Sequence, residues 1–261
     1  MISFVGAGPG APDLITLRGA RRLADADVVI WAGSLVPDAL LDHCRADVVR
    51  HDSKGMTLED VVAVYAAHPG AAIVRLHSGD PSVFSAIAEQ VAWCVAHDRD
   101  FEVVPGVSSM AAAAAAGGCE LTVPGVSQSV VLTRLADRTS ASLGPNERRD
   151  AAGPVASFAA HGVTMALFLS AGRPEALEEQ LLDAASAYRP DTPALVAHRV
   201  SWPDEHLVST TVGELAATIR SMGISMGAIV LVGDAVGISA PPRRSHVYAT
   251  DHPHSFRSID G

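Results

Sequence analysis

The sequence predicts an α/β protein of two domains, with a mostly parallel sheet in the first domain and a mixed sheet in the second. In the first half of the chain, short apolar segments alternate with helical segments, which is typical of a parallel sheet covered on both faces. In the second half, two strand-like segments follow one another across a short turn, which indicates antiparallel neighbours. The 261 residues, 48% of them hydrophobic, suffice for two small domains.

Each element of the first half has a local signal. Strands are expected at short apolar runs, and helices at runs with helical periodicity. Thr16 can cap the first helix, and Thr57 with Asp60 resembles a capping box at the second. Ser82 is a further cap, which predicts a helix over residues 82–97. The expected strands are 2–5, 28–31, 72–76 and 101–104, and the expected helices are 17–26, 57–67, 82–97 and 108–117.

The second half has longer irregular segments. Residues 137–154 are polar with glycines and prolines, which predicts a long mobile loop. Residues 240–261 lack periodicity, which predicts a flexible tail. We place the domains at 1–119 and 120–239. The expected strands are 130–133, 164–170, 194–200, 206–212 and 228–233, and the expected helices are 174–188 and 213–222.

Composition excludes several classes of protein. The net charge of −10 disfavours a nucleic-acid-binding surface. No apolar run reaches the roughly 18 residues of a membrane span, and no basic leader precedes the first strand. Cys44, Cys94 and Cys119 lie far apart without metal-ligand spacing, so we expect free thiols, no metal and a cytoplasmic location.

Three loops directly follow expected strands of the first half. They are Gly-Ala-Gly-Pro-Gly at 6–10, His-Ser-Gly-Asp-Pro at 77–81 and Pro-Gly-Val-Ser-Ser at 105–109. Ligands of open α/β sheets bind at the carboxyl ends of strands, so these loops predict a ligand site. The first loop roughly fits a dinucleotide turn, but Asp25 and Asp27 precede the second strand instead of ending it. A dinucleotide-dependent oxidoreductase is therefore a disfavoured alternative.

Together with residues 121–138, the loops at 6–10 and 77–81 carry a resemblance. In this order they resemble the tetrapyrrole methyltransferases that build the corrin ring. The runs Ser-Gln-Ser-Val-Val-Leu-Thr-Arg at 127–134 and Ser-Trp-Pro-Asp-Glu at 201–205 are similar to the branch that methylates C11 of precorrin-4. That reaction gives precorrin-5 in cobalamin biosynthesis. The resemblance covers residues 1 to about 235 and leaves methylation at C2, C17 or C20 as alternatives.

The resemblance implies a fold like the class III methyltransferases, with S-adenosylmethionine in the cleft between the domains. It also implies a homodimer and no metal. Because an electron-rich ring carbon can attack the methyl group directly, no catalytic residue is assigned; His198, Asp80 and Glu205 are conceivable bases. The expected cofactor-binding residues are Pro9, Ser78, Gly79, Asp80, Val83, Ser108, Ser109, Leu169 and Ala197.

The substrate implied by the resemblance bears many acetate and propionate groups. Arginine pairs with carboxylates through its planar fork, so an acidic protein is expected to gather arginine locally. The expected substrate-binding residues are Arg134, Arg138, His198 and Arg199, with Arg173 and His77 as further candidates. The residues leave open whether the substrate holds cobalt, and a non-catalytic tetrapyrrole carrier is an alternative from another class.

Overall fold

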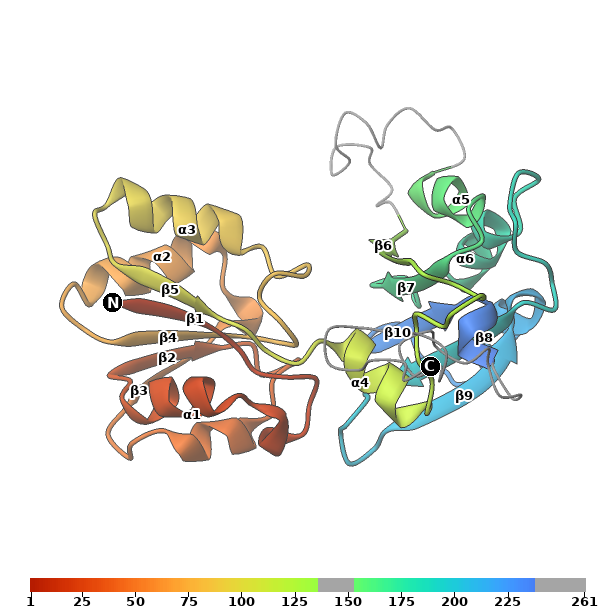
Figure 1. Ribbon diagram of the computed structural model, residues 1–261. Helices are drawn as coiled ribbons and strands as arrows, with labels where there is room; N and C mark the ends of the chain where they lie inside the picture. The colour runs from red at the N-terminus through yellow and green to blue at the C-terminus, as the bar shows by residue number, and fades with distance from the viewer. Residues whose placement is uncertain (136–152, 238–261) are drawn as a thin grey trace, which may run out of the picture. The chain divides into compact units, whose positions relative to one another are not determined.

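The computed structural model describes residues 1–135 and 153–237 (Figure 1). The chain divides into two compact units, of which the first comprises Met1–Ala112 with Arg199–His206 and the second the remainder. Most of the expected loop 137–154 lies outside the described residues, as does the expected tail 240–261. Pro154 is described, and it begins a helix instead of ending a loop.

The sheet of the first unit has five strands in the order β3-β2-β4-β1-β5. All its pairings are parallel, with Val5 opposite both Leu76 and Val104. The expected parallel sheet is therefore confirmed, and all its strands end at one edge. The strands are β1 Ile2–Gly6, β2 Val28–Trp31, β3 Val49–Asp52, β4 Ile73–His77 and β5 Phe101–Val104.

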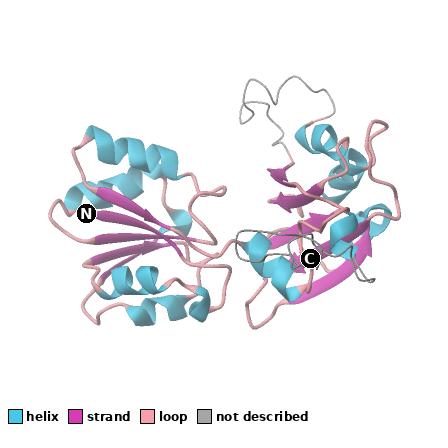
Figure 2. Ribbon diagram, viewed as in Figure 1, coloured by secondary structure: helices cyan, strands magenta, loops and turns pink. Residues whose placement is uncertain are grey.

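Helices cover both faces of this sheet (Figures 1 and 2). Helix α1, Leu17–Ala24, packs Leu23 on one face, against Val5 and Leu76. Helices α2, Leu58–Ala67, and α3, Ile87–Ala96, cover the other face, where Tyr65 packs with Phe4. Successive strand residues point to opposite faces, so neighbouring residues of β1 enter different cores. Short 3₁₀ helices lie at Pro12–Leu14, Asp38–His43 and Ser53–Gly55, and α4 spans Ser109–Ala116.

Two of the expected caps are present and one is not. The Thr16 hydroxyl accepts a hydrogen bond from Gly19 N at 3.1 Å, and the capping box at Thr57 is complete. The helix expected from residue 82 begins only at Ile87. Phe84 and Ala86 have φ of 51° and 48°, which right-handed helix does not permit. Ser82 instead donates to the Asp80 carboxylate through its backbone N–H and its hydroxyl.

The second unit has a mixed sheet in the order β6-β7-β10-β8-β9. β6 runs parallel to β7, whereas β10 is antiparallel to both β7 and β8. Helix α6 ends at Leu181, earlier than the expected 188, and the Tyr188 hydroxyl folds back to donate to Val163 O. The strands are β6 Val130–Arg134, β7 Thr164–Phe168, β8 Pro193–His198, β9 His206–Thr211 and β10 Ala228–Val232; the helices are α5 Pro154–Ala159, α6 Pro174–Leu181 and α7 Leu215–Ser221, with 3₁₀ turns at Val212–Glu214 and Asp234–Gly237.

Three strands of this second sheet point the same way. β8 and β7 both oppose β10, so β6, β7 and β8 all end at one edge. The register aligns Thr133 with Leu167, Leu167 with Val230 and Val230 with Val196. The residues that follow this row along β6, β7 and β8 therefore lie at the same edge.

Among the described helices, none has the length and apolar character needed to cross a membrane.

Candidate functional site

The loops after β1, β4 and β5, which we call the edge loops, are joined by hydrogen bonds. Gly8 N donates to Gly79 O at 3.2 Å, and Gly79 N donates to Gly8 O at 2.7 Å. The Asp80 carboxylate accepts from Gly106 N at 2.8 Å. The chain thus brings together three loops that are far apart in sequence and holds them by backbone groups and the Asp80 carboxylate.

Glycine is required where the edge loops touch. A Cβ at Gly106 would lie 2.2 Å from Gly79 O and 2.8 Å from Gly6 Cα. Gly79 is different: its φ of +65° favours glycine, while a Cβ there would lie no closer than 3.8 Å to Ser108 Cα and Ser109 N. The expected cofactor residues Gly79, Ser108 and Ser109 therefore border the same small region.

Asp80 carries a negative charge within the edge loops. Burial acts to raise the pKa of its carboxyl, but hydrogen bonds from the Ser82 hydroxyl and from the N–H groups of Gly106 and Ser82 outweigh it, so the pKa lies below its usual value. Both oxygens already accept hydrogen bonds. The ionised carboxylate of Asp80 therefore joins the loop after β4 to the loop after β5. Because its pKa is lowered, this carboxylate is a weak proton acceptor.

The glycine-rich loop at residues 6–11 does not offer a phosphate cradle. Such a cradle directs several backbone N–H groups at one anion from a helix N-terminus. Here Ala7 N donates to His77 O and Gly8 N to Gly79 O, and Ala11 N donates to the Ser201 hydroxyl at 2.9 Å. The element that follows is a three-residue 3₁₀ turn. This geometry disfavours the dinucleotide alternative.

His77 ends β4 in a buried position, 7% exposed. Its ring centroid lies 6.1 Å from that of Phe4, and its Nε2 has no hydrogen-bond partner within the described ranges. Burial, assisted by the charge of Arg75, lowers the pKa of His77 to about 3. The imidazole is therefore neutral near pH 7 and supplies no positive charge for substrate carboxylates.

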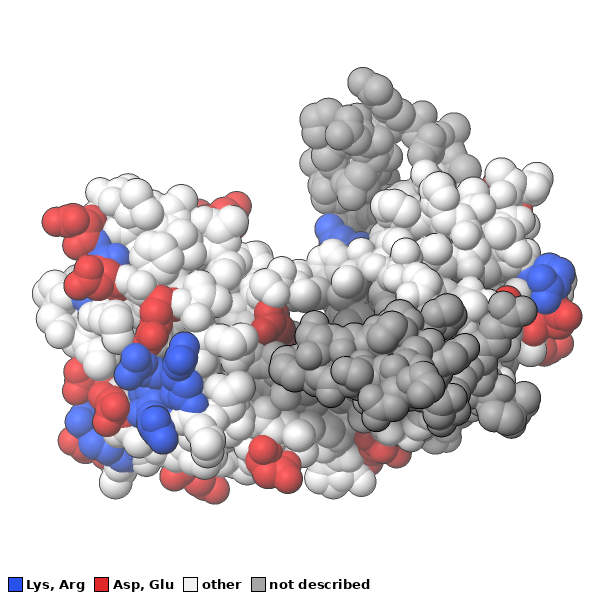
Figure 3. All heavy atoms as spheres, viewed as in Figure 1, with Lys and Arg blue, Asp and Glu red and all other residues white. Residues whose placement is uncertain are grey.

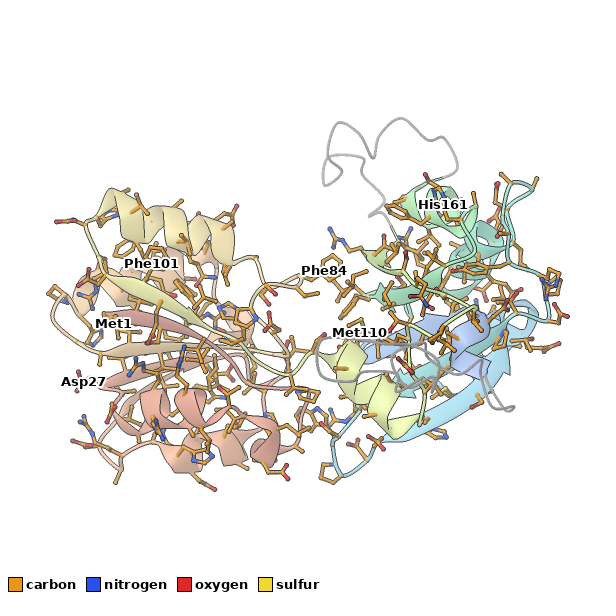
Figure 4. The ribbon with its side chains drawn as sticks, viewed as in Figure 1. Met1, Asp27, Phe84, Phe101, Met110 and His161 are labelled. Carbon is orange, nitrogen blue, oxygen red and sulfur yellow. The ribbon has the colours of Figure 1, made fainter. Side chains whose placement is uncertain are left out.

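Seven of the expected cofactor residues lie in the edge loops of the first unit. Pro9 is buried, Ser78 is exposed, and the others are half-buried. Phe84, on the same loop as Val83, is 47% exposed and lies beyond the carboxyl edge, whereas Met1 marks the opposite end of the sheet (Figure 4). These seven are Pro9, Ser78, Gly79, Asp80, Val83, Ser108 and Ser109.

The other expected residues, apart from Arg199, lie on the second sheet, directly after one of its strands, or outside the described residues. Arg134 ends β6 opposite Phe168 and is half-buried, and His198 ends β8. Leu169 follows β7 with φ 50° and 68% exposure. Ala197 is 1% exposed, so it has little surface for a ligand. Arg138 lies outside the described residues.

Arg199 belongs to the turn Arg199–His206, which we call the Trp202 turn and which forms part of the first unit. The guanidinium carbon of Arg199 lies 4.0 Å from the ring centroid of Trp202, and its Nε donates to the Asp204 carboxylate at 2.7 Å. These partners hold the side chain, and its contact with substrate stays a prediction. Glu205, conceived as a base, accepts from Ser201 N at 2.6 Å.

The sequence did not indicate that Ser201 and Trp202 contact the glycine-rich loop. Trp202 Nε1 donates to Pro9 O at 3.0 Å across 193 residues of chain. Neither periodicity nor spacing predicts a contact between residues so far apart in sequence. The one sequence signal at this turn is the resemblance of residues 201–205 to the family. On the face in Figure 3, several basic side chains gather over α1 with acidic ones nearby, and other basic side chains are scattered over both units. Within 1–135 and 153–237, no group of three or more His, Cys, Asp or Glu side chains is placed to hold a metal.

Comparison with known proteins identifies the family. The sequence model described as Tetrapyrrole (Corrin/Porphyrin) Methylases matches residues 1–216. The cobalt-precorrin-4 C(11)-methyltransferase of Methanocaldococcus jannaschii is 36% identical over 98% of this chain and 95% of its own length. The precorrin-4 C(11)-methyltransferase of Mycobacterium tuberculosis is 42% identical over 90% of this chain and 91% of its own.

Solved structures that resemble this chain come from the same family. A cobalt precorrin-4 methyltransferase superposes with a TM-score of 0.83 at 37% identity, over 91% of this chain and 96% of that one. The uroporphyrin-III C-methyltransferase of Thermus thermophilus, complexed with S-adenosylhomocysteine, superposes with a TM-score of 0.72 at 28% identity, over 92% and 95%. The edge loops, the two sheets and these full-length matches establish that the chain belongs to the tetrapyrrole (corrin/porphyrin) methylases.

Proposed function

We propose that this protein transfers a methyl group from S-adenosylmethionine to C11 of precorrin-4, giving precorrin-5 in cobalamin biosynthesis. The observation that carries the proposal is the near full-length similarity to enzymes named for that reaction. The set of glycine-built edge loops at the carboxyl end of a parallel sheet supports it, because that edge is where open α/β sheets bind ligands.

The residues of the edge loops fit S-adenosylmethionine. Gly79, with its left-handed backbone, leaves the region beside Ser108 and Ser109 without a side chain, as a ligand in close contact with backbone requires. When bound, the cofactor supplies an electrophilic methyl group on a sulfonium cation. We assign its binding to Pro9, Ser78, Gly79, Asp80, Val83, Ser108 and Ser109 in the first unit, and to Leu169 in the second. Ala197, at 1% exposure, is too buried to be assigned.

The protein's own side chains hold and orient the reactants in this proposal, without a dedicated base. His77 is neutral because of its lowered pKa, and Asp80 and Glu205 are engaged in hydrogen bonds to backbone. Orientation alone contributes up to roughly 7–11 kcal/mol in well-aligned reactions. We therefore assign catalysis to positioning of the two reactants.

Substrate carboxylates are assigned to the second unit. Arg134 and His198 end strands that run in the same direction, so their side chains start from one edge of the sheet. Arg138 and Arg199 complete the proposed set. We further propose that the protein is a cytoplasmic homodimer, which sedimentation of the purified chain and fractionation of its host would test.

Methyl transfer from labelled S-adenosylmethionine to a precorrin-4 pool tests the function. We expect one added methyl group, placed at C11 by nuclear magnetic resonance of the product. Parallel reactions with cobalt-precorrin-4 decide which form is the substrate, since the relatives include enzymes named for each. A methyl group at C2, C17 or C20, or binding of the tetrapyrrole without methylation, would refute the proposal.

Titration with NADH, followed by its fluorescence, addresses the dinucleotide alternative directly. We expect no binding, because the amide groups of Ala7, Gly8 and Ala11 already donate within the protein. S-adenosylhomocysteine titrated under the same conditions serves as the positive control. Tight binding of NADH with none of S-adenosylhomocysteine would favour the oxidoreductase.

A further inference from the structure

The Trp202 turn contacts the glycine-rich loop through two hydrogen bonds. Trp202 Nε1 donates to Pro9 O at 3.0 Å, and the Ser201 hydroxyl accepts from Ala11 N at 2.9 Å. Proline lacks a backbone N–H, so the carbonyl of Pro9 is the polar group by which that residue can be anchored. The two bonds fix the residues on either side of Gly10.

Gly10 fits against the same indole ring. A Cβ on Gly10 would lie 2.2 Å from Cδ1 and 2.4 Å from Nε1 of Trp202. The backbone of Gly10 therefore lies directly against the edge of the indole ring that carries Cδ1 and Nε1. Gly10 is buried and Trp202 is half-buried. The Trp202 side chain thus makes both a close van der Waals contact with Gly10 and a hydrogen bond to Pro9 O.

The Trp202 turn is braced in an uncommon backbone conformation. Arg199 and Ser201 have φ of 47° and 66°, a region that costs non-glycine residues free energy. The Arg199 guanidinium covers the indole, and Asp204 and Glu205 hold Arg199 Nε and Ser201 N at 2.7 and 2.6 Å. Because strain of this kind persists only when the surroundings over-determine it, the turn is built to hold Trp202 in one place.

We propose that Trp202 is a positioning residue for S-adenosylmethionine: it holds residues 9–11 in the conformation that binds the cofactor, without touching the reacting atoms. The inference rests on the proposed function and adds a residue to that site. Ordering one backbone residue on binding lowers affinity by about a factor of ten. A loop already ordered by Trp202 avoids that loss at Pro9 and Gly10.

Hydrogen exchange of the ligand-free protein tests the contact itself. The Ala11 amide has the Ser201 hydroxyl as its acceptor, so we expect it to be protected in the wild type. Trp202→Ala and Ser201→Ala should each speed exchange in the peptide containing Ala11 by at least tenfold. Unchanged protection in both variants would overturn the proposal, whatever the enzyme catalyses.

A double-mutant cycle tests its consequence for the cofactor. Gly10→Ala should weaken binding of S-adenosylhomocysteine at least tenfold, since its methyl overlaps the indole. Trp202→Ala should weaken binding about thirtyfold, and Trp202→Phe, which loses one hydrogen bond, about fivefold. Adding Gly10→Ala to Trp202→Ala should change affinity less than twofold, because the overlapping ring is gone. Gly70→Ala, with nothing within 4 Å of its Cβ, is the matched control.

Kinetics separates positioning from a general structural role. The KM for S-adenosylmethionine should rise in Trp202→Phe by the same factor as the dissociation constant of S-adenosylhomocysteine, while the KM for the tetrapyrrole holds within twofold. Multiplicative effects of Gly10→Ala and Trp202→Ala, or equal rises in both KM values, would overturn the proposal. A wild-type protein that neither binds S-adenosylhomocysteine nor transfers methyl would instead refute the proposed function.

Discussion

The carboxyl edges of the two sheets are built in different ways. In the first unit, glycine backbones lie so close that a Cβ at Gly106 would be 2.2 Å from Gly79 O. In the second unit, the edge presents side chains: Arg134 and His198 end two of three strands that run in the same direction, and Leu169 follows the third. Changes at the backbone contacts between the edge loops should therefore lower stability, whereas changes of side chains at the second edge should lower ligand affinity. Each of the following experiments tests that contrast.

The largest effect is expected at Gly106. Gly106→Ala places a methyl group against the backbone of two other loops, which cannot rotate away as a side chain can. We expect the free energy of unfolding in urea to fall by about 3 kcal/mol. Gly70→Ala, in open space, should change it by less than about 0.5 kcal/mol. Equal stability of both variants would mean that the edge loops are not closed as described.

The next effect is expected at Arg134, on the edge built by side chains. Arg134→Ala should weaken binding of the tetrapyrrole about 10- to 100-fold through the loss of charged hydrogen bonds, as measured by absorbance titration. Affinity for S-adenosylhomocysteine should hold. Arg189→Ala is the control, since Arg189 forms an exposed ion pair with Asp191 in the same unit. Unaltered tetrapyrrole affinity would remove Arg134 from the proposed site.

A smaller effect, dependent on pH, is expected at Asp80. Asp80→Asn replaces an ionised acceptor of Gly106 N and should lower the free energy of unfolding by about 1–2 kcal/mol. The folded pKa of Asp80 lies below its unfolded value of 3.8, so its contribution is present above pH 3.8 and is lost as pH falls through the folded pKa. The difference between wild type and variant should shrink below pH 3.8; a difference independent of pH would contradict this role.

The smallest change in stability is expected at Leu169. Leu169 has a φ of 50°, and replacing it with glycine removes a backbone strain of about 1–2 kcal/mol. The greater freedom of glycine in the unfolded chain cancels about 0.5–1 kcal/mol of that gain in stability. The free energy of unfolding should thus change by less than about 1.5 kcal/mol. Affinity for S-adenosylhomocysteine should fall about fivefold as apolar contact area is lost. Met226→Gly, at 76% exposure in the same unit, should leave that affinity unchanged.

Much of the fold follows from local pattern. The alternation of apolar and helical segments predicted a mostly parallel first sheet, and two strands across a short turn predicted a mixed second sheet. Thr57 with Asp60 predicted its capping box. The pattern does not predict strand β3, because Val49–Asp52 is polar and pairs with β2 alone. The pattern predicts the start of α3 too early, because Ser82 resembles a helix cap, whereas its hydroxyl donates to the Asp80 carboxylate.

The edge loops were likewise visible as glycine, proline and serine directly after apolar strands, and the direction of parallel strands places them together. Residue type and spacing along the chain thus determined the two sheets, apart from strand β3, and the loops that follow β1, β4 and β5. The tertiary structure alone decided that Gly6, Gly79 and Gly106 touch, that His77 is neutral and that Trp202 lies against Gly10. Those facts depend on atoms brought together from up to 193 residues away, and on the burial that results. Periodicity predicts which face of a helix or strand a residue lies on, but not which distant residue contacts it there.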